Sequence, residues 1–209
     1  MNTTLPSTLV CIGDSITEAG FAPLGWATLL RASLATRSHG PWKLVNAGVS
    51  GRHSGEMLDR LNELVLPHLP AVALINLGVN DAYHQAWQQI PRVSLGEFRR
   101  NLTEMVRILR ARNSVPVLVV GHALRDSGIF VQGNGRPQPE NFAPYQAAIR
   151  PLAAELMCAC IDLPALAAEA GEQPDAFVRE GDGVHLSPAG QALYARLLEV
   201  GLDDAGLLH

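Results

Sequence analysis

Thr8-Leu9-Val10-Cys11-Ile12 leads directly into Gly13-Asp14-Ser15-Ile16-Thr17 near the start of the chain. The first stretch is almost continuously apolar, which is typical of a strand buried on both faces of a parallel sheet. The second stretch opens with turn-forming residues, so the strand is expected to end there. Ser15 is therefore expected at the rim of a sheet, where its hydroxyl can meet residues from other parts of the chain.

Short apolar runs of this kind recur along the chain and alternate with segments of helical periodicity. Strands are predicted at 8–13, 42–46, 71–77, 115–121 and 159–163, and helices at 25–37, 54–66, 95–112, 143–157 and 188–200. The alternation favours an α/β fold: a three-layer α/β/α sandwich with a doubly wound, mainly parallel five-stranded sheet and right-handed crossovers. Because no repeat or linker divides the pattern, residues 1–209 are expected to form a single domain.

Composition and charge exclude several classes of partner. Hydrophobic residues make up 47% of the 209 residues and charged residues 17%, as in a globular protein rather than a disordered chain. The net charge is −4 and the basic residues do not cluster, so nucleic acid is not expected as a partner.

No apolar run reaches the roughly 18 to 20 residues of a membrane span, and no signal peptide is visible. A cytoplasmic location is expected, with Cys11, Cys158 and Cys160 as buried free thiols.

Three further polar segments carry chemistry. Asn46-Ala47-Gly48-Val49-Ser50-Gly51 and Gly78-Val79-Asn80-Asp81 each follow an apolar run, and Asp182-Gly183-Val184-His185 lies near the end of the chain. Function in such sheets gathers at the carboxyl ends of the strands, so the first two segments are expected beside Ser15. A histidine three residues after an aspartate can be oriented by it and can serve a serine as a base. Together these segments predict an ester hydrolase.

The four blocks, in this order, resemble those of the SGNH (GDSL-type) hydrolase superfamily from residue 8 to about residue 200. The first block matches at Gly13, Asp14 and Ser15, and the second at Asn46, Gly48 and Gly51. The third block is 78–81 and the fourth is Asp182-Gly183-Val184-His185-Leu186-Ser187. The position after Ser15 is Ile16 rather than the family's leucine, which is a conservative change.

This resemblance implies the flavodoxin-like sheet of the SGNH hydrolases and a serine esterase that needs no cofactor and no metal. It makes Ser15 the nucleophile, His185 its base and Asp182 the residue that orients His185. It also assigns the oxyanion hole to the backbone N–H groups of Ser15 and Gly51 and to the side-chain amide of Asn80. The expected substrate is a small-molecule carboxylic ester with a short or acetyl acyl group. A lysophospholipid or a thioester cleaved by the same mechanism is the alternative.

Two other classes stay open on the residues alone. A metal-dependent phosphoesterase could use Asp14, Asp81, His84 and His185 as ligands, and it would lose activity on chelation. A non-catalytic ligand-binding module would tolerate the loss of Ser15. An α/β-hydrolase is disfavoured because 13–17 does not form that fold's Gly-x-Ser-x-Gly motif.

The surroundings of the site are predicted only in outline. His84 is expected in the pocket wall or in a solvated loop, and His122 at the edge of the sheet. The loops 83–91 and 125–141 are expected to shape the pocket, since such insertions commonly carry specificity.

Overall fold

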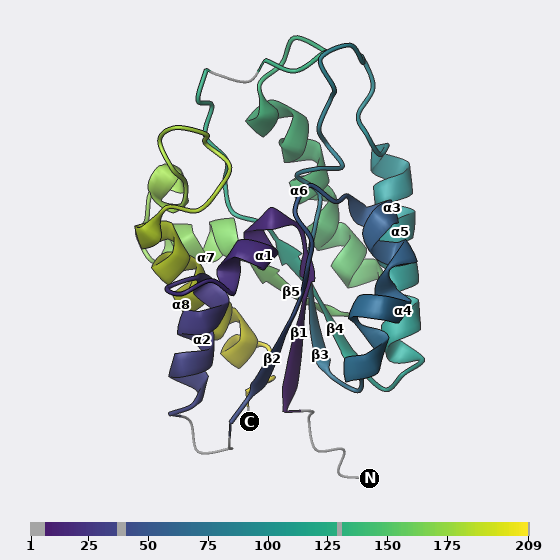
Figure 1. Cartoon of the computed structure of the whole chain (residues 1–209), viewed down its shortest axis with the longest axis vertical. Coiled ribbons are helices and arrows are strands. Elements are labelled where there is room, and N and C mark those ends of the chain that lie inside the picture. The colour runs from purple at the N-terminus through teal and green to yellow at the C-terminus, as the bar shows by residue number, and fades with distance from the viewer. Residues whose placement is uncertain (1–6, 37–40, 129–130, 209) are drawn as a thin grey trace.

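Five parallel strands form one sheet in the order β2-β1-β3-β4-β5 (Figure 1). The computed structural model describes residues 7–36, 41–128 and 131–208. The strands are β1 (Thr8–Gly13), β2 (Lys43–Gly48), β3 (Val72–Asn76), β4 (Val115–Val120) and β5 (Ala159–Asp162). The chain begins near the middle of the sheet, moves to one edge at β2, and then crosses β1 to build the other side. The predicted doubly wound α/β fold is therefore confirmed.

Helices cover both faces of the sheet (Figure 1). Leu9 and Cys11 of β1 pack on one face, and Val10 and Ile12 pack on the other, because alternate side chains of a strand point to opposite faces. The first face is covered by α2 (Trp26–Leu34), α7 (Leu163–Glu169) and α8 (Pro188–Asp204). The second is covered by α3 (Ser54–Asp59), α4 (Leu61–Leu64), α5 (Leu95–Arg110) and α6 (Gln138–Glu155).

Several boundaries differ from those predicted. The short helix α1 (Ser15–Gly20) was not expected; it forms because the Asp14 carboxylate accepts a hydrogen bond from the Ile16 N–H at its start. The helix expected over 54–66 is broken into α3, α4 and the 3₁₀ turn η1 (Leu66–His68), and Pro67 lies in that turn. A helix α7 and a second 3₁₀ turn, η2 (Pro174–Phe177), were also missed.

Helix α6 begins at Gln138 rather than at 143, so the expected loop 125–141 ends in a helical turn. Pro139 suits this first turn because its missing N–H would have no partner there. The predicted apolar face of α5 is confirmed, and all of its members are buried: Phe98, Leu102, Met105, Val106 and Leu109.

The carboxyl ends of the three adjacent strands β2, β1 and β3 lie level with one another. In the register of the sheet, Gly13 of β1 pairs with Gly48 of β2 and with Asn76 of β3. Chain leaving these strands therefore starts from one edge. A side chain at Gly48 would be impossible, since its Cβ would lie 2.6 Å from the Glu18 backbone nitrogen in α1. The absence of a side chain at Gly48 lets α1 rest against the end of β2.

Two other expectations concerned the burial of the three cysteines and the absence of a membrane span. Cys11, Cys158 and Cys160 are all free thiols, as expected, but Cys160 is exposed and Cys158 is partly exposed, so only Cys11 is fully buried. Among the helices of the described ranges, none combines the length and apolar character that crossing a membrane requires.

Candidate active site

Ser15, His185 and Asp182 form a continuous chain of hydrogen bonds. Ser15 is the first residue of α1, directly after β1, and its Oγ lies 3.0 Å from the His185 Nε2. The His185 Nδ1 lies 3.0 Å from the Asp182 Oδ2. Because a carboxylate only accepts, Nδ1 carries the proton and Nε2 is left free to accept the Ser15 hydroxyl proton. The structure therefore brings together the three residues that the sequence placed at opposite ends of the chain.

Asp182 holds its own loop as well as the imidazole. Its Oδ1 accepts hydrogen bonds from the backbone N–H groups of Val184 and His185, both at 2.8 Å. Burial opposes ionisation of Asp182, but these N–H groups and the His185 imidazole outweigh it and lower the pKa of the carboxyl. Asp182 is therefore ionised at neutral pH and can stabilise a positive charge on His185.

Other segments hold this loop, which is not part of the sheet. The Arg125 N–H donates to the Gly183 carbonyl at 2.8 Å, and the Arg179 N–H donates to the His185 carbonyl at 2.9 Å. The His122 Nε2 donates to the Val184 carbonyl at 2.8 Å. Three separate backbone carbonyls of the Asp182–His185 loop are thus fixed from outside.

His122 acts on this loop rather than on the cavity. Its ring packs against Phe177 and Tyr194 and is buried. Burial lowers the pKa of His122 to about 4, although the bond to Val184 opposes this effect. The imidazole is therefore neutral at physiological pH. The prediction of a sheet-edge residue is confirmed, since His122 follows β4 by two residues.

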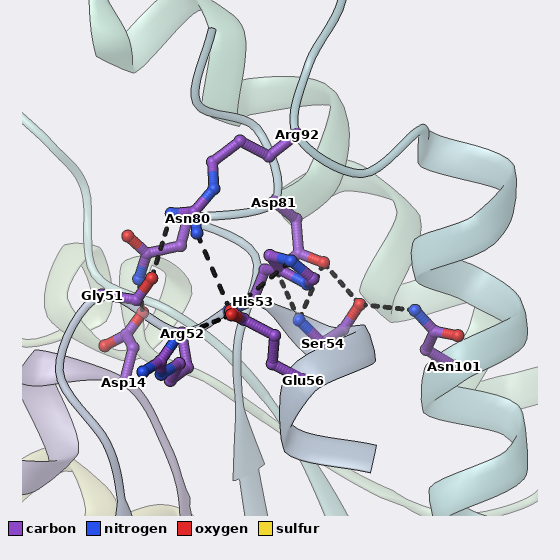
Figure 2. Close-up of polar contacts among 10 residues, drawn as sticks. All are labelled: Asp14, Gly51, Arg52, His53, Ser54, Glu56, Asn80, Asp81, Arg92 and Asn101. Atoms are coloured by element: carbon purple, nitrogen blue, oxygen red, sulfur yellow. Dashed lines mark hydrogen bonds and ion pairs between the residues drawn. The ribbon is translucent and has the colours of Figure 1, made fainter. Parts of the chain in front are cut away.

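Gly51 and Asn80 follow the ends of β2 and β3, as predicted. Gly51 has a left-handed backbone with φ of +74°, and among the described residues no acceptor is bonded to its N–H. The Asn80 Nδ2 donates to the Asp14 Oδ2 at 3.3 Å, which leaves its second hydrogen for another acceptor (Figure 2). The Ser15 N–H lies at the first position of α1, where helices leave this donor without an internal partner.

Asp14 is a buried carboxylate beside these groups. Its two oxygens accept from the Ile16 N–H and from Asn80, and it is 3% exposed. Burial raises the pKa of Asp14 to about 6, with the charge of Asp81 adding to the effect and the Ile16 bond opposing it. The first block of the sequence pointed to Asp14, but no signal there indicated that it would hold the Asn80 amide.

Asp81 belongs to a separate buried network. Its carboxylate accepts from the backbone N–H of Ser54 at 3.0 Å and from the Ser54 hydroxyl, which in turn accepts from Asn101 at 2.9 Å (Figure 2). His84 is buried, and its Nδ1 donates to the Ala82 carbonyl at 3.0 Å, so the expectation of a solvated loop was wrong. Within the described ranges, no three His, Cys, Asp or Glu side chains are grouped to hold a metal ion.

A cavity of about 370 Å³ adjoins His185. The loop 83–91 contributes Tyr83 to its wall, and the segment 125–141 contributes the described residues 125–127 and Gln138 with Pro139. Both loops therefore shape the pocket, as predicted. The remaining wall comes from Val79, Asn80, Asp182 and Val184.

Arg92 is a site neighbour that the sequence did not indicate. Its guanidinium donates to the Gly51 carbonyl at 3.0 Å (Figure 2). A single arginine after a polar loop has no local signature of such a contact, because its partner lies 41 residues away in the chain.

Known proteins share this architecture. The chain is 34% identical over 116 residues to the esterase TesA of Pseudomonas aeruginosa, covering 54% of this chain and 53% of that protein. It is 30% identical over 115 residues to an Escherichia coli protein named thioesterase 1/protease 1/lysophospholipase L1, covering 54% of this chain and 50% of that protein. The alignments thus span about half the length of these relatives. The crystal structure of an acetyl xylan esterase, AlAXEase, superposes with a TM-score of 0.76 at 25% identity, covering 93% of this chain and 99% of that one.

A family model confirms the resemblance found in the four blocks. The model of the GDSL-like lipase/acylhydrolase family matches residues 11–193, which include Ser15, Gly51, Asn80, Asp182 and His185. That match extends over most of the described sheet and over both sides of the site. The chain therefore belongs to the GDSL-like lipase/acylhydrolase family.

Proposed function

We propose that this protein is a serine hydrolase of carboxylic esters. The observation that carries the proposal is the hydrogen-bonded chain from Ser15 through His185 to Asp182, of which His185 and Asp182 line a cavity of about 370 Å³. Membership of the family and the esterases among the relatives support the same reaction class. In this proposal Ser15 is the nucleophile, His185 the general base and Asp182 the group that orients it.

The reaction proceeds through an acyl-enzyme. Neutral His185 takes the proton of Ser15 as the hydroxyl oxygen attacks the acyl carbonyl carbon, and the carbonyl oxygen becomes an oxyanion. Collapse of this intermediate breaks the bond to the alcohol, which leaves with the proton held by His185. Water then repeats the cycle on the acyl-enzyme, and Ser15 recovers its proton from His185. Asp182 stays ionised throughout and stabilises the imidazolium.

Three donors would hold the oxyanion: the N–H groups of Ser15 and Gly51 and the amide of Asn80. Their free hydrogens at the level carboxyl ends of β1, β2 and β3 support this assignment. Fixed donors of this kind account for a large part of the rate enhancement in such enzymes, because the donors need not reorganise as charge develops on the oxygen. Asp14 would serve as a positioning residue that orients the Asn80 amide.

The size of the cavity favours a small substrate. A volume of about 370 Å³ lies near the lower end of the roughly 300–1,000 Å³ typical of ligand pockets. Val79, Tyr83, Pro139 and Val184 give much of its wall an apolar character. A short-chain or acetyl ester is therefore the proposed substrate. The thioesterase and lysophospholipase named in one relative make an acyl thioester or a lysophospholipid the second candidate.

The test is hydrolysis of a graded panel by the purified chain. The panel contains aryl esters with acyl groups from acetyl to decanoyl, an acyl thioester and a lysophospholipid. We expect the highest kcat/KM with the short esters, no loss on chelation, and complete loss in Ser15→Ala. Ser50→Ala is the matched control, since Ser50 is an exposed serine of the neighbouring Gly51 turn. Activity that survives in Ser15→Ala, or that disappears on chelation, would contradict the proposal.

A further inference from the structure

The turn that presents the Gly51 N–H is poorly held by packing. Gly51 is exposed and has φ of +74°, and a Cβ built on it would meet no atom within 4 Å. Glycine has wide conformational freedom. The flanking residues are bonded, Ser50 N–H to Glu18 and Arg52 N–H to the Val49 carbonyl, both at 3.2 Å, but neither bond involves the N–H or the carbonyl of Gly51 itself. A donor that must point at a developing oxyanion therefore needs another restraint at this position.

Arg92 supplies such a restraint. One guanidinium nitrogen donates to the Gly51 carbonyl at 3.0 Å, and the other lies 3.7 Å from a carboxylate oxygen of Glu56 in the first turn of α3 (Figure 2). Glu56 also accepts from the His53 N–H at 3.2 Å, just two residues after Gly51. The guanidinium therefore links the carbonyl of the glycine turn to the start of the following helix.

The backbone of Arg92 is itself anchored on both sides. Its N–H donates to the Tyr83 carbonyl at 2.9 Å, which closes the loop 83–91. The next residue, Val93, donates to the Asp81 carbonyl at 3.1 Å. Only 24% of the Arg92 side chain is exposed. A fixed base and a partly buried side chain make the bond to Gly51 a stable one, and the same loop contributes Tyr83 to the cavity wall.

A simple surface ion pair does not explain this arrangement. Glu56 already has a closer partner in Arg52, at 2.7 Å, so it does not need Arg92 for its charge. Exposed ion pairs contribute little to stability in any case. The shortest contact of the Arg92 guanidinium is with a backbone carbonyl of the proposed oxyanion turn. That contact restrains the direction of the Gly51 backbone.

We propose that Arg92 is a positioning residue that holds the Gly51 turn so that its N–H points at the oxyanion. The inference rests on the proposed function, in which Gly51 is a donor. Arg92 touches no reacting atom, so it acts through Gly51. Its loss should lower kcat and leave KM nearly unchanged, because the misdirected donor matters mainly in the transition state.

The experiment compares Arg92→Ala and Arg92→Lys with Arg99→Ala. Arg99 of α5 forms an ion pair with Glu155 of α6 at 2.8 Å and has no hydrogen bond or ion pair to a site residue in the described ranges, so it is a matched control. Removal of one oxyanion donor costs about 10²–10³ in kcat, and misdirection should cost less, about 10- to 100-fold. We expect this loss in Arg92→Ala, a smaller loss in Arg92→Lys, which retains a donor, and none in Arg99→Ala. Active sites are titrated with an organophosphonate, so that kcat refers to folded enzyme only.

The outcomes separate this inference from the proposed function. Unchanged kcat in Arg92→Ala, or a raised KM with kcat retained, would overturn the positioning role while leaving the esterase assignment intact. If the wild type neither hydrolyses esters nor reacts with the phosphonate, the proposed function itself fails. If Arg92→Ala does not fold, the titrated kcat of Arg92→Lys decides: a value equal to that of the wild type overturns the role.

Discussion

Ser15 and His185 reach the same point from two parts of the molecule that are built differently. Ser15, Gly51 and Asn80 follow the level ends of three paired strands, so the sheet itself sets where each begins. His185 lies in a loop whose carbonyls accept hydrogen bonds from His122 and Arg125, in the stretch after β4, and from Arg179, just before the loop. The sheet side of the site, with Ser15, Gly51 and Asn80, is positioned by the hydrogen-bonded strands of the sheet. The loop side, with Asp182 and His185, is positioned by individual hydrogen bonds.

Because the two sides are held differently, different substitutions are expected to lower activity on each side. On the sheet side, the proposed donors follow strand ends that the register holds level. Asp14 bonds the Asn80 amide and Arg92 bonds the Gly51 carbonyl, and in our proposal these contacts set the directions of the two donors. On the loop side, Asp182 bonds the imidazole of His185, the proposed base, and also two backbone N–H groups of its own loop. A change there is expected to disturb chemistry most.

After the complete loss expected in Ser15→Ala, the largest effect is expected from Asp182→Asn. The variant retains an oxygen for the Val184 and His185 N–H groups but offers the imidazole an amide, so the tautomer that accepts the Ser15 proton is no longer favoured. We expect kcat to fall about 10⁴-fold. Thermal unfolding should change little. The measurement is steady-state kinetics beside a thermal melt, and a loss below about 100-fold would show that the loop side is less critical than proposed.

The next effect concerns a donor on the sheet side. Asn80→Ala should lower kcat by about 10²–10³ and leave KM nearly unchanged, because the amide acts on charge that develops in the transition state. If Asn80 only stabilises its loop, the melting temperature should fall instead and kcat per folded enzyme should hold. Measuring kcat, KM and the melt of this variant distinguishes the two roles.

The sheet side could be predicted from the sequence more fully than the contacts made by loop side chains. Ser15, Gly51 and Asn80 each follow the end of a predicted strand, so their location at one edge of the sheet was predictable, since parallel strands share one carboxyl edge. The pairing of His185 with Ser15 was expected from the block order and the resemblance. The contact of Arg92 with Gly51 was not, because a side chain reaching across from a loop leaves no periodic or motif signal. The early start of α6 was missed because a polar, proline-containing stretch reads as loop.

The smallest effect on rate is expected from Asp14→Asn, a substitution that should raise stability at neutral pH while lowering activity. Burial raises the pKa of Asp14 to about 6, so ionising it costs the folded state up to about 3 kcal/mol relative to the unfolded chain. For this group, stability falls as pH rises from about 4 to about 6 and stays reduced above that. Asp81, His185 and Tyr194 are the titratable neighbours that interact with it electrostatically.

Asp14→Asn should therefore melt at a higher temperature than the wild type at pH 8 and at a similar temperature at pH 4. Its kcat should fall about tenfold, because the single amide oxygen of the variant can replace only one of the two Asp14 oxygens that accept from the Ile16 N–H and from Asn80, and any bond that remains is no longer to a charged group. Melts at both pH values and kcat at pH 8 provide the check. A variant that is both less stable at pH 8 and fully active would show that Asp14 serves the fold rather than the Asn80 amide.

Covalent labelling can show whether the hydroxyl of Ser15, two residues beyond β1, is the nucleophile. The wild-type protein is treated with an organophosphonate ester, digested, and the modified peptide is identified by mass spectrometry. We predict one adduct per chain, on Ser15, absent in Ser15→Ala and retained in Ser50→Ala. An adduct on Ser50 or on another serine, or labelling that persists in Ser15→Ala, would contradict the account.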